Sequence, residues 1–266
     1  MYLPLAGTNL YLTEAGAGSS ALFLHGVPDS ADMWQPIIQR MQGQYHCYAP
    51  DLPGLGRSTA PANFPLTLDH LANFIAALVE GAAITMPLNL VVTDFGAPYG
   101  LSWAVTHPEK VRRIALVGGV NFFSDYRWHR NAQLLRLPLV GDLLMGLSGN
   151  YSVFARSMKG ATPLLDDEHW RATHALSFAK PSVRQMTLRL YRSLNPHDFI
   201  GWEDKFVALT RQVPTLVLWG DRDPFIAPSF ADRYGAAQVE HFAEYDHWLA
   251  LEAPEIVADR LATLFA

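Results

Sequence analysis

Short apolar runs alternate with segments of helical periodicity along most of this 266-residue chain. Runs of this length between turn residues are typical of buried strands. Seven are present, at Thr8–Thr13, Ala21–Leu24, Tyr45–Ala49, Leu88–Val92, Val111–Val117, Thr215–Trp219 and Gln238–Phe242. Between them, apolar residues recur every three or four positions, as in the stretch from Leu68 to Leu78. Strands that alternate with helices in this way predict an α/β fold with a mostly parallel sheet.

The alternation stops between residues 121 and 201. Strand-like runs vanish there, and Trp, Tyr, Phe, Leu and Met recur at helical intervals among scattered Gly and Pro. We therefore expect a core domain formed by residues 1–120 and 202–266. Residues 121–201 should form a helical cap domain that lies over the carboxyl edge of the sheet.

The stretch Leu88–Gly100, LNLVVTDFGAPYG, passes from an apolar run directly into a helix-compatible segment. Small residues at Thr93, Gly96 and Ala97 allow a helix to pack closely on the strand while Asp94 is held in a strained, outward-pointing conformation. Such a strand–turn–helix is the shape of a nucleophile elbow. Asp is also a favoured N-cap residue, so this stretch by itself leaves both roles open for Asp94.

Two further polar groups, Asp223 and His247, come shortly after predicted strands. Ligands bind at the carboxyl ends of parallel strands, so Asp94, Asp223 and His247 can meet in space. Asp221 and His241 are alternatives, but His241 lies within a predicted strand rather than after it. The pattern therefore favours Asp94 as a nucleophile and His247 as a base, and leaves Asp221 and Asp223 both open as the acid.

Composition narrows the classes of partner. Half of the residues are hydrophobic and the formal net charge is −5, with no basic cluster, so we expect neither a nucleic-acid nor an anionic-membrane partner. The single cysteine, Cys47, excludes an internal disulfide and has no zinc-site spacing. No apolar run approaches 18 residues and the N-terminus lacks a signal-peptide pattern, so we expect a cytoplasmic protein.

Several motifs accompany these groups, and as a set they span nearly all of the chain outside residues 121–201. They are His25-Gly26-Val27-Pro28, Asp51–Ser58, Gly220-x-x-Asp223, and Asp246-His247-Trp248 followed by Leu251–Pro254. This set resembles the α/β-hydrolase fold superfamily, in the aspartate-nucleophile branch that contains epoxide hydrolases and haloalkane dehalogenases. The resemblance implies an eight-stranded, mostly parallel sheet flanked by helices. It also implies a substrate site lined by His25, Pro28, Phe95 and Trp248.

The resemblance further implies a mechanism with a covalent intermediate. An aspartate carboxylate is ionised at neutral pH, so Asp94 can attack a saturated carbon without a base and form an alkyl-enzyme ester. His247 would then activate water, with Asp223 orienting its ring. The backbone N–H groups of Val27 and Phe95 are the expected oxyanion hole. The scheme needs no metal and no organic cofactor.

The leaving group is the open question, between an epoxide and a haloalkane as the small hydrophobic substrate. Haloalkane dehalogenases generally hold the halide with a Trp after the nucleophile, together with an Asn in the HGxP loop or a Trp in the cap. This chain has Phe95 and Val27 at the first two places, so only a cap Trp such as Trp128 or Trp170 could supply a side-chain donor. Epoxide hydrolases use cap tyrosines as acids, and Tyr191 and Tyr151 resemble these. We therefore expect an epoxide hydrolase. The alternatives are a haloalkane dehalogenase, an esterase- or lactonase-like hydrolase, and a small-molecule binding protein on a hydrolase scaffold.

Overall fold

A single eight-stranded sheet forms the centre of the molecule. The computed structural model describes residues 1–266 and places the strands in the order β1-β2-β4-β3-β5-β6-β7-β8. The strands are β1 (Tyr2–Leu5), β2 (Thr8–Ala15), β3 (Ser19–Leu24), β4 (Tyr45–Pro50), β5 (Leu88–Val92), β6 (Val111–Val117), β7 (Thr215–Gly220) and β8 (Gln238–Phe242). Strand β2 runs antiparallel to both neighbours and every other pair is parallel. The predicted fold class is confirmed.

Strand β1 is the one strand that the hydrophobic pattern does not predict. It has four residues, includes Pro4, and has no fully buried side chain. It pairs only with β2, from Tyr2 opposite Tyr11 to Leu5 opposite Thr8. Proline is tolerated in a sheet mainly at such an edge. Its residues are apolar, but the run is short and contains Pro4, and proline within a run argues against a strand.

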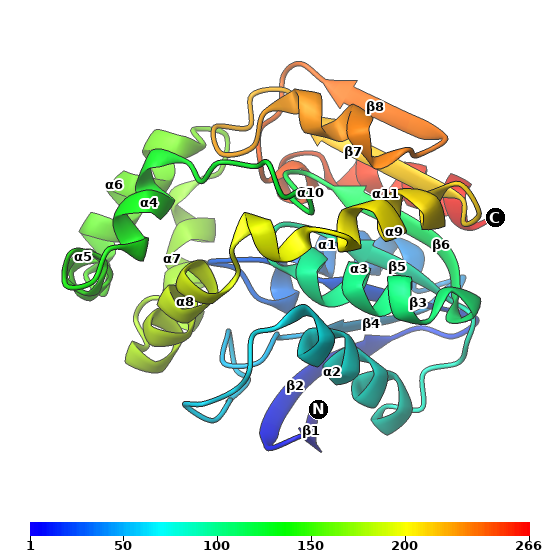
Figure 1. Ribbon diagram of the computed structural model, residues 1–266, viewed down its shortest axis with the longest axis horizontal. Helices are drawn as coiled ribbons and strands as arrows, with labels where there is room; N and C mark the ends of the chain where they lie inside the picture. The colour runs from blue at the N-terminus through cyan, green and yellow to red at the C-terminus, as the bar shows by residue number, and fades with distance from the viewer.

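Helices cover both faces of the sheet. Helices α2 (Leu68–Gly81), α3 (Gly96–Thr106) and α9 (Trp202–Thr210) lie on the face toward the viewer in Figure 1. Helices α1 (Gln35–Met41), α10 (Leu249–Glu252) and α11 (Pro254–Phe265) cover the other face. Along β5, Leu88, Leu90 and Val92 pack into the first layer and Val91 into the second. Strands buried on both faces read as continuous apolar runs, which is why the sequence predicts them well.

Residues 121–201, which follow β6, contain helices and no strand. These are α4 (Arg130–Arg136), α5 (Val140–Leu147), α6 (Tyr151–Ala161), α7 (Asp167–Leu176), α8 (Pro181–Ser193) and the short η3 (Pro196–Phe199). Helices α4 to α8 group together at the left of Figure 1. We call residues 121–201 the helical insertion. It has a small apolar cluster of its own, to which the core contributes Trp248. No helix of the chain is long and apolar enough to cross a membrane.

Candidate active site

Asp94 occupies the sharp turn between β5 and α3. Its φ of +42° lies in the left-handed region, which costs energy for a non-glycine residue. The turn requires small neighbours: a Cβ at Gly96 would lie 2.4 Å from the Leu24 carbonyl oxygen, and one at Gly100 would lie 2.6 Å from a Val92 methyl group. Helix α3 therefore packs directly against β3 and β5. The elbow geometry that the sequence predicts for Asp94 is present.

The two oxygens of the Asp94 carboxylate have different surroundings. The Val27 N–H donates a hydrogen bond of 2.7 Å to Oδ1. A Cβ at Gly26 would lie 2.1 Å from this same oxygen, so the close approach of the loop depends on glycine there. The Phe95 N–H, at the start of α3, donates to no acceptor among the turn, loop and cap contacts. Oδ1 is thus held by the backbone, and Oδ2 is left for other partners.

His247 lies between the other two predicted residues. Its Nδ1–H donates to Asp223 Oδ2 at 2.8 Å, and its Nε2 lies 3.7 Å from Asp94 Oδ2. The second oxygen of Asp223 accepts hydrogen bonds from the N–H groups of Phe225 (2.7 Å) and Ile226 (3.0 Å). The Asp223 carboxylate is therefore fixed by the turn after β7, and it orients the His247 ring toward Asp94.

Opposing effects set the protonation of His247. Burial lowers the pKa of the imidazole, but the charges of Asp223 and Asp94 and the hydrogen bonds to them outweigh it, so the pKa lies well above its ordinary value. The contribution of Asp94 depends on its negative charge. Any reaction that neutralises this carboxylate therefore lowers the pKa of His247 and increases the fraction of the ring that is neutral and able to accept a proton.

The alternative pair lies elsewhere. Asp221 Oδ1 and His241 Nδ1 are 2.6 Å apart, and both side chains are about one-third exposed. His241 also lies 3.5 Å from Asp232. These residues form an ion-pair cluster beside β8, and they do not line the cavity at Asp94. The family spacing Gly220-x-x-Asp223, and the position of His247 after its strand, thus point to the two residues that lie beside Asp94.

A cavity of about 370 Å³ separates Asp94 and His247 from the helical insertion. Pro28, Phe95 and Trp248, which were expected at the substrate site, contribute to its wall. Of its 28 lining residues 19 are hydrophobic, and Asp94 is the one Asp, Glu, Lys or Arg among them. The cavity is therefore suited to an apolar molecule, and no Lys or Arg lines it that could hold a substrate carboxylate.

Tyr191 of α8 lines this cavity opposite the elbow. Its ring packs edge-on against Phe95, with centroids 5.0 Å apart, and its hydroxyl has no hydrogen-bond partner in the protein. Burial, followed by the charge of Asp94, raises the pKa of Tyr191 well above its ordinary value. The hydroxyl therefore stays protonated and free to donate into the cavity.

Tyr151 does not reach the cavity, contrary to the sequence expectation. Its hydroxyl donates to Asp167 Oδ1 at 2.7 Å, and Arg171 stacks over its ring. The start of α6 points this side chain toward α7. Two polar partners within the helical insertion thus hold Tyr151 away from Asp94.

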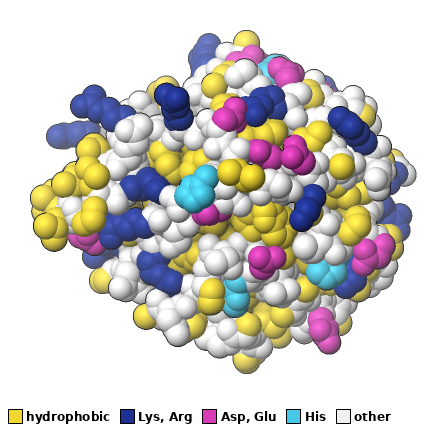
Figure 2. Space-filling view, in the orientation of Figure 1, with side chains coloured by type: hydrophobic (Ala, Val, Ile, Leu, Met, Phe, Trp, Pro, Cys, Tyr) yellow, Lys and Arg dark blue, Asp and Glu magenta, His cyan; other side chains and the backbone are white.

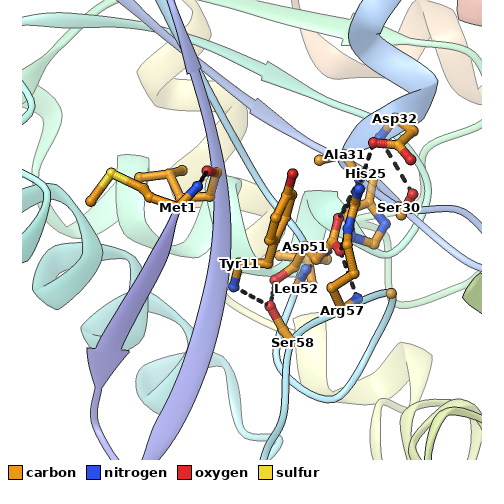
Figure 3. A network of polar contacts seen from close by, with 12 residues as sticks. Met1, Tyr11, His25, Ser30, Ala31, Asp32, Asp51, Leu52, Arg57 and Ser58 are labelled. Atoms are coloured by element: carbon orange, nitrogen blue, oxygen red, sulfur yellow. Dashed lines mark hydrogen bonds and ion pairs between the residues drawn. The ribbon is translucent and has the colours of Figure 1, made fainter.

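His25 also has a structural environment instead of a place in the cavity wall. Its Nδ1–H donates to the Gly26 carbonyl at 2.7 Å and its Nε2 accepts from the Leu52 N–H at 2.9 Å. Beside it, Asp51 accepts hydrogen bonds from Ala31 N–H and from Arg57, as Figure 3 shows. Burial lowers the pKa of His25, so the ring is neutral. This network fixes the HGVP loop against the loop after β4.

The sequence did not single out His129, which lines the cavity at the start of α4. Its Nδ1 accepts from the Ala132 N–H at 3.4 Å as the helix N-cap, which leaves the proton on Nε2. Burial, and then the charge of His247, lower the pKa of His129 to about 4. A neutral imidazole with a free N–H therefore accompanies Tyr191. The one sequence feature that could have indicated His129 is its position directly before the helical stretch that begins at Arg130.

Asp29, next to the HGVP loop, is a buried carboxylate that joins three segments. Its Oδ2 accepts a hydrogen bond of 2.8 Å from the indole N–H of Trp248, the neighbour of His247. Its Oδ1 accepts from the Thr173 hydroxyl of α7 at 3.4 Å. Burial raises the pKa of Asp29. The carboxylate thus links the loop that carries Val27, the loop that carries His247 and the helical insertion.

Known proteins with the same architecture include hydrolases of two kinds. A hydrolase of Saccharomyces cerevisiae described as uncharacterized is 33% identical, over 95% of this chain and 93% of that protein. A haloalkane dehalogenase of Mesorhizobium japonicum is 30% identical, over 88% of this chain and 79% of that protein. The crystal structure of a Bacillus megaterium epoxide hydrolase with an inhibitor has 26% identity and a TM-score of 0.79, over 100% of this chain and 99% of that one.

The model of the alpha/beta hydrolase fold family matches residues 22–254, which include Asp94, Asp223 and His247. The order of the strands and the elbow between β5 and α3 are consistent with the fold of this family. The chain belongs to the α/β-hydrolase family and is a hydrolase with haloalkane dehalogenase and epoxide hydrolase relatives.

Proposed function

We propose that the protein hydrolyses epoxides through an ester on Asp94. The observation that carries the proposal is the asymmetry of this carboxylate. Oδ1 is held by the Val27 N–H, while Oδ2 faces His247 at the cavity. A residue that only bound a ligand would not need one carboxylate oxygen fixed and the other aimed at a histidine base. The arrangement suits an oxygen nucleophile, Oδ2, whose partner oxygen later carries negative charge.

In the first step Oδ2 of Asp94 attacks a carbon of the epoxide ring. The C–O bond of the ring breaks, and its electron pair goes to the ring oxygen. This oxygen takes the hydroxyl proton of Tyr191, which leaves a hydroxyalkyl ester on Asp94. The neutral Nε2–H of His129 is a second donor to the same oxygen. The apolar wall excludes bulk water, which strengthens both interactions.

In the second step water cleaves the ester. His247 accepts a proton from the water, whose oxygen attacks the carbonyl carbon of the Asp94 ester. The electron pair of the carbonyl moves onto Oδ1, which the N–H of Val27 stabilises together with that of Phe95. Collapse of this intermediate breaks the ester C–O bond, and the departing alkoxide takes the remaining proton of the attacking water, which releases the diol and restores the Asp94 carboxylate. The proton held by His247 returns to the Tyr191 phenolate. Because esterification removes the Asp94 charge, the pKa of His247 falls when a base is required.

Dehalogenation is the second candidate, favoured by one observation. The indole N–H of Trp128 lies in a cavity-lining side chain and has no hydrogen-bond acceptor. A halide would need such donors, because the side chains of Val27 and Phe95 cannot donate. Tyr191 and His129 supply protons that a halide does not need. The two free donors that can protonate an alkoxide therefore favour the epoxide.

Trapping the ester tests the proposal and orders the two candidates. His247→Gln should still be alkylated at Asp94 but should not hydrolyse the ester. Intact mass should then show the mass of a whole epoxide added, whereas a 1-bromoalkane would add only its alkyl group. Asp94→Asn in the same background should abolish any adduct. Adducts from bromoalkanes alone would put dehalogenation first, and turnover without any adduct would contradict the Asp94 nucleophile.

A further inference from the structure

Exposed apolar side chains gather on the helical insertion, around α5. Six of them, between 38% and 83% exposed, form what we call the apolar insertion face: Leu137, Leu139, Val140, Leu143, Leu144 and Leu147. The opposite side of α5 is buried through Gly141 and Met145. Figure 2 shows this group of hydrophobic side chains at the left end of the molecule, where Figure 1 labels α5. Contiguous apolar patches of this kind usually mark interaction sites.

The apolar insertion face has no free charge within its helix. The single charged residue of α5 is Asp142, which pairs with Arg192 at 2.9 Å. Leu139 is the most exposed member, at 83%. Its φ of +64° is also unfavourable for a branched side chain. Helix α5 buries only Gly141 and Met145 and exposes its leucines, whereas an ordinary surface helix buries its apolar side chains and exposes polar ones.

The face is continuous with the mouth of the cavity at Asp94. Leu134, Leu144 and Val153 line the cavity and are also 37%, 38% and 44% exposed. They come from three different helices, α4, α5 and α6. The cavity therefore opens to the outside at the edge of the apolar insertion face, where the exposed polar residues Asn131 and Ser157 also line it.

Charge is divided unevenly between the two parts of the chain. The helical insertion contains ten Lys and Arg against six Asp and Glu, a formal charge of +4. The remaining residues contain ten against nineteen, a formal charge of −9. The net charge of −5, from which no anionic-membrane partner was expected, conceals this difference and with it the basic character of the part that surrounds the cavity mouth.

Unpaired arginines flank the mouth itself. Arg130 lies one helical turn before Leu134, and Arg156 lies one turn after Val153, so each shares a helix face with a residue of the mouth. Both arginines are exposed and make no ion pair or hydrogen bond. Unpaired guanidinium groups beside exposed leucines are the features by which a surface helix binds an anionic bilayer.

We propose that the apolar insertion face docks on an anionic lipid surface, so that the cavity mouth opens toward the apolar part of the bilayer. A symmetric contact between two copies through this face would bring two insertions of charge +4 together, which argues against a second copy as the occupant. The docking does not depend on the reaction. The corollary that substrate enters from the lipid, as an epoxide of a long apolar chain, rests on the proposed function.

Vesicle co-sedimentation tests the docking, with phosphatidylcholine alone or mixed with phosphatidylglycerol. The protein should sediment with the anionic vesicles, and less so at high salt. Arg130→Gln and Arg156→Gln should each weaken binding about fivefold, because one basic side chain near an anionic surface increases the binding constant by about that factor. Leu139→Asn with Leu143→Gln should weaken it roughly tenfold. Met86→Ser is the matched control, because Met86 is 44% exposed and precedes β5 at the opposite end of the strand from Asp94.

Three results would overturn the docking: no sedimentation with anionic vesicles, unchanged binding by the leucine variants, or a dimer in solution that these variants dissociate. Hydrolysis of a short, water-soluble epoxide separates this proposal from the proposed function. The leucine variants should keep that activity while losing the vesicles. Vesicle binding by a protein without epoxide hydrolysis would leave the docking intact and contradict the function alone.

Discussion

Gly119, in the loop after β6, is the most sensitive steric position of the site. A Cβ there would lie 2.0 Å from Asp223 Oδ2 and 2.2 Å from His247 Nδ1. These two atoms are themselves 2.8 Å apart, so the added methyl group would enter their hydrogen bond. Gly119 has no positive φ, so Gly119→Ala adds no backbone strain and acts only through this contact.

The size of the effect follows from the distances. Real Cβ contacts stay above 3.0 Å, so both atoms must move away from the added carbon by about 1 Å, in diverging directions. The hydrogen bond would then exceed the range of about 2.7 to 3.2 Å in which it contributes. Loss of the orienting acid costs roughly 10⁴-fold in related triads. Because His247 acts only on the ester, turnover of Gly119→Ala should fall by about 10³- to 10⁴-fold while alkylation of Asp94 continues.

Rapid quenching followed by intact mass spectrometry measures both steps. The variant should show one equivalent of adduct formed at the wild-type rate and then hydrolysed slowly. Gly43→Ala is the control, since a Cβ at Gly43 has no atom within 4 Å. Thermal denaturation checks that Gly119→Ala is folded. A folded variant with turnover within about tenfold of wild type would refute the assignment of Asp223 as the orienting acid.

Three further predictions concern protons and positioning at the site. Tyr191→Phe should slow diol formation by roughly 10²- to 10⁴-fold in single turnovers, and by less if His129 shares the protonation. Asp94→Asn should lower the pKa of His247 toward its ordinary value, measured by NMR of the imidazole. The raised pKa of His247 in the folded state stabilises the fold fully below the unfolded value of about 6.5, and this contribution is lost as the pH rises through the folded value. Asp94→Asn should therefore lose stability mainly at acid pH, which denaturation at several pH values measures. Asp29→Ala should lower kcat and leave the indole beside His247 mobile in fluorescence anisotropy, whereas Asp29→Asn should largely restore both, because an amide can keep both hydrogen bonds.

The sequence by itself determined the core of the fold and the residues that meet at the elbow. The strands β3 to β7 are largely buried and must therefore be mostly apolar, so they were legible without any contact information. The less buried β2 and β8 were also predicted, from shorter patterns of strand-forming residues. Asp94, Asp223 and His247 each follow a strand, and parallel strands end at one edge, so chain order was sufficient to bring them together.

Only the tertiary structure decided which side chains of the helical insertion face the cavity. Tyr151 and His129 both lie at helix starts, but Tyr151 turns to Asp167 while His129 lines the cavity. His25 stands in the loop beside Asp94 and yet bonds to the backbone of Leu52. The direction of a side chain on a short helix depends on how that helix packs against others, and periodicity does not encode it. The same packing puts the leucines of α5 outside and beside the cavity mouth, because burial is a property of neighbours distant in sequence.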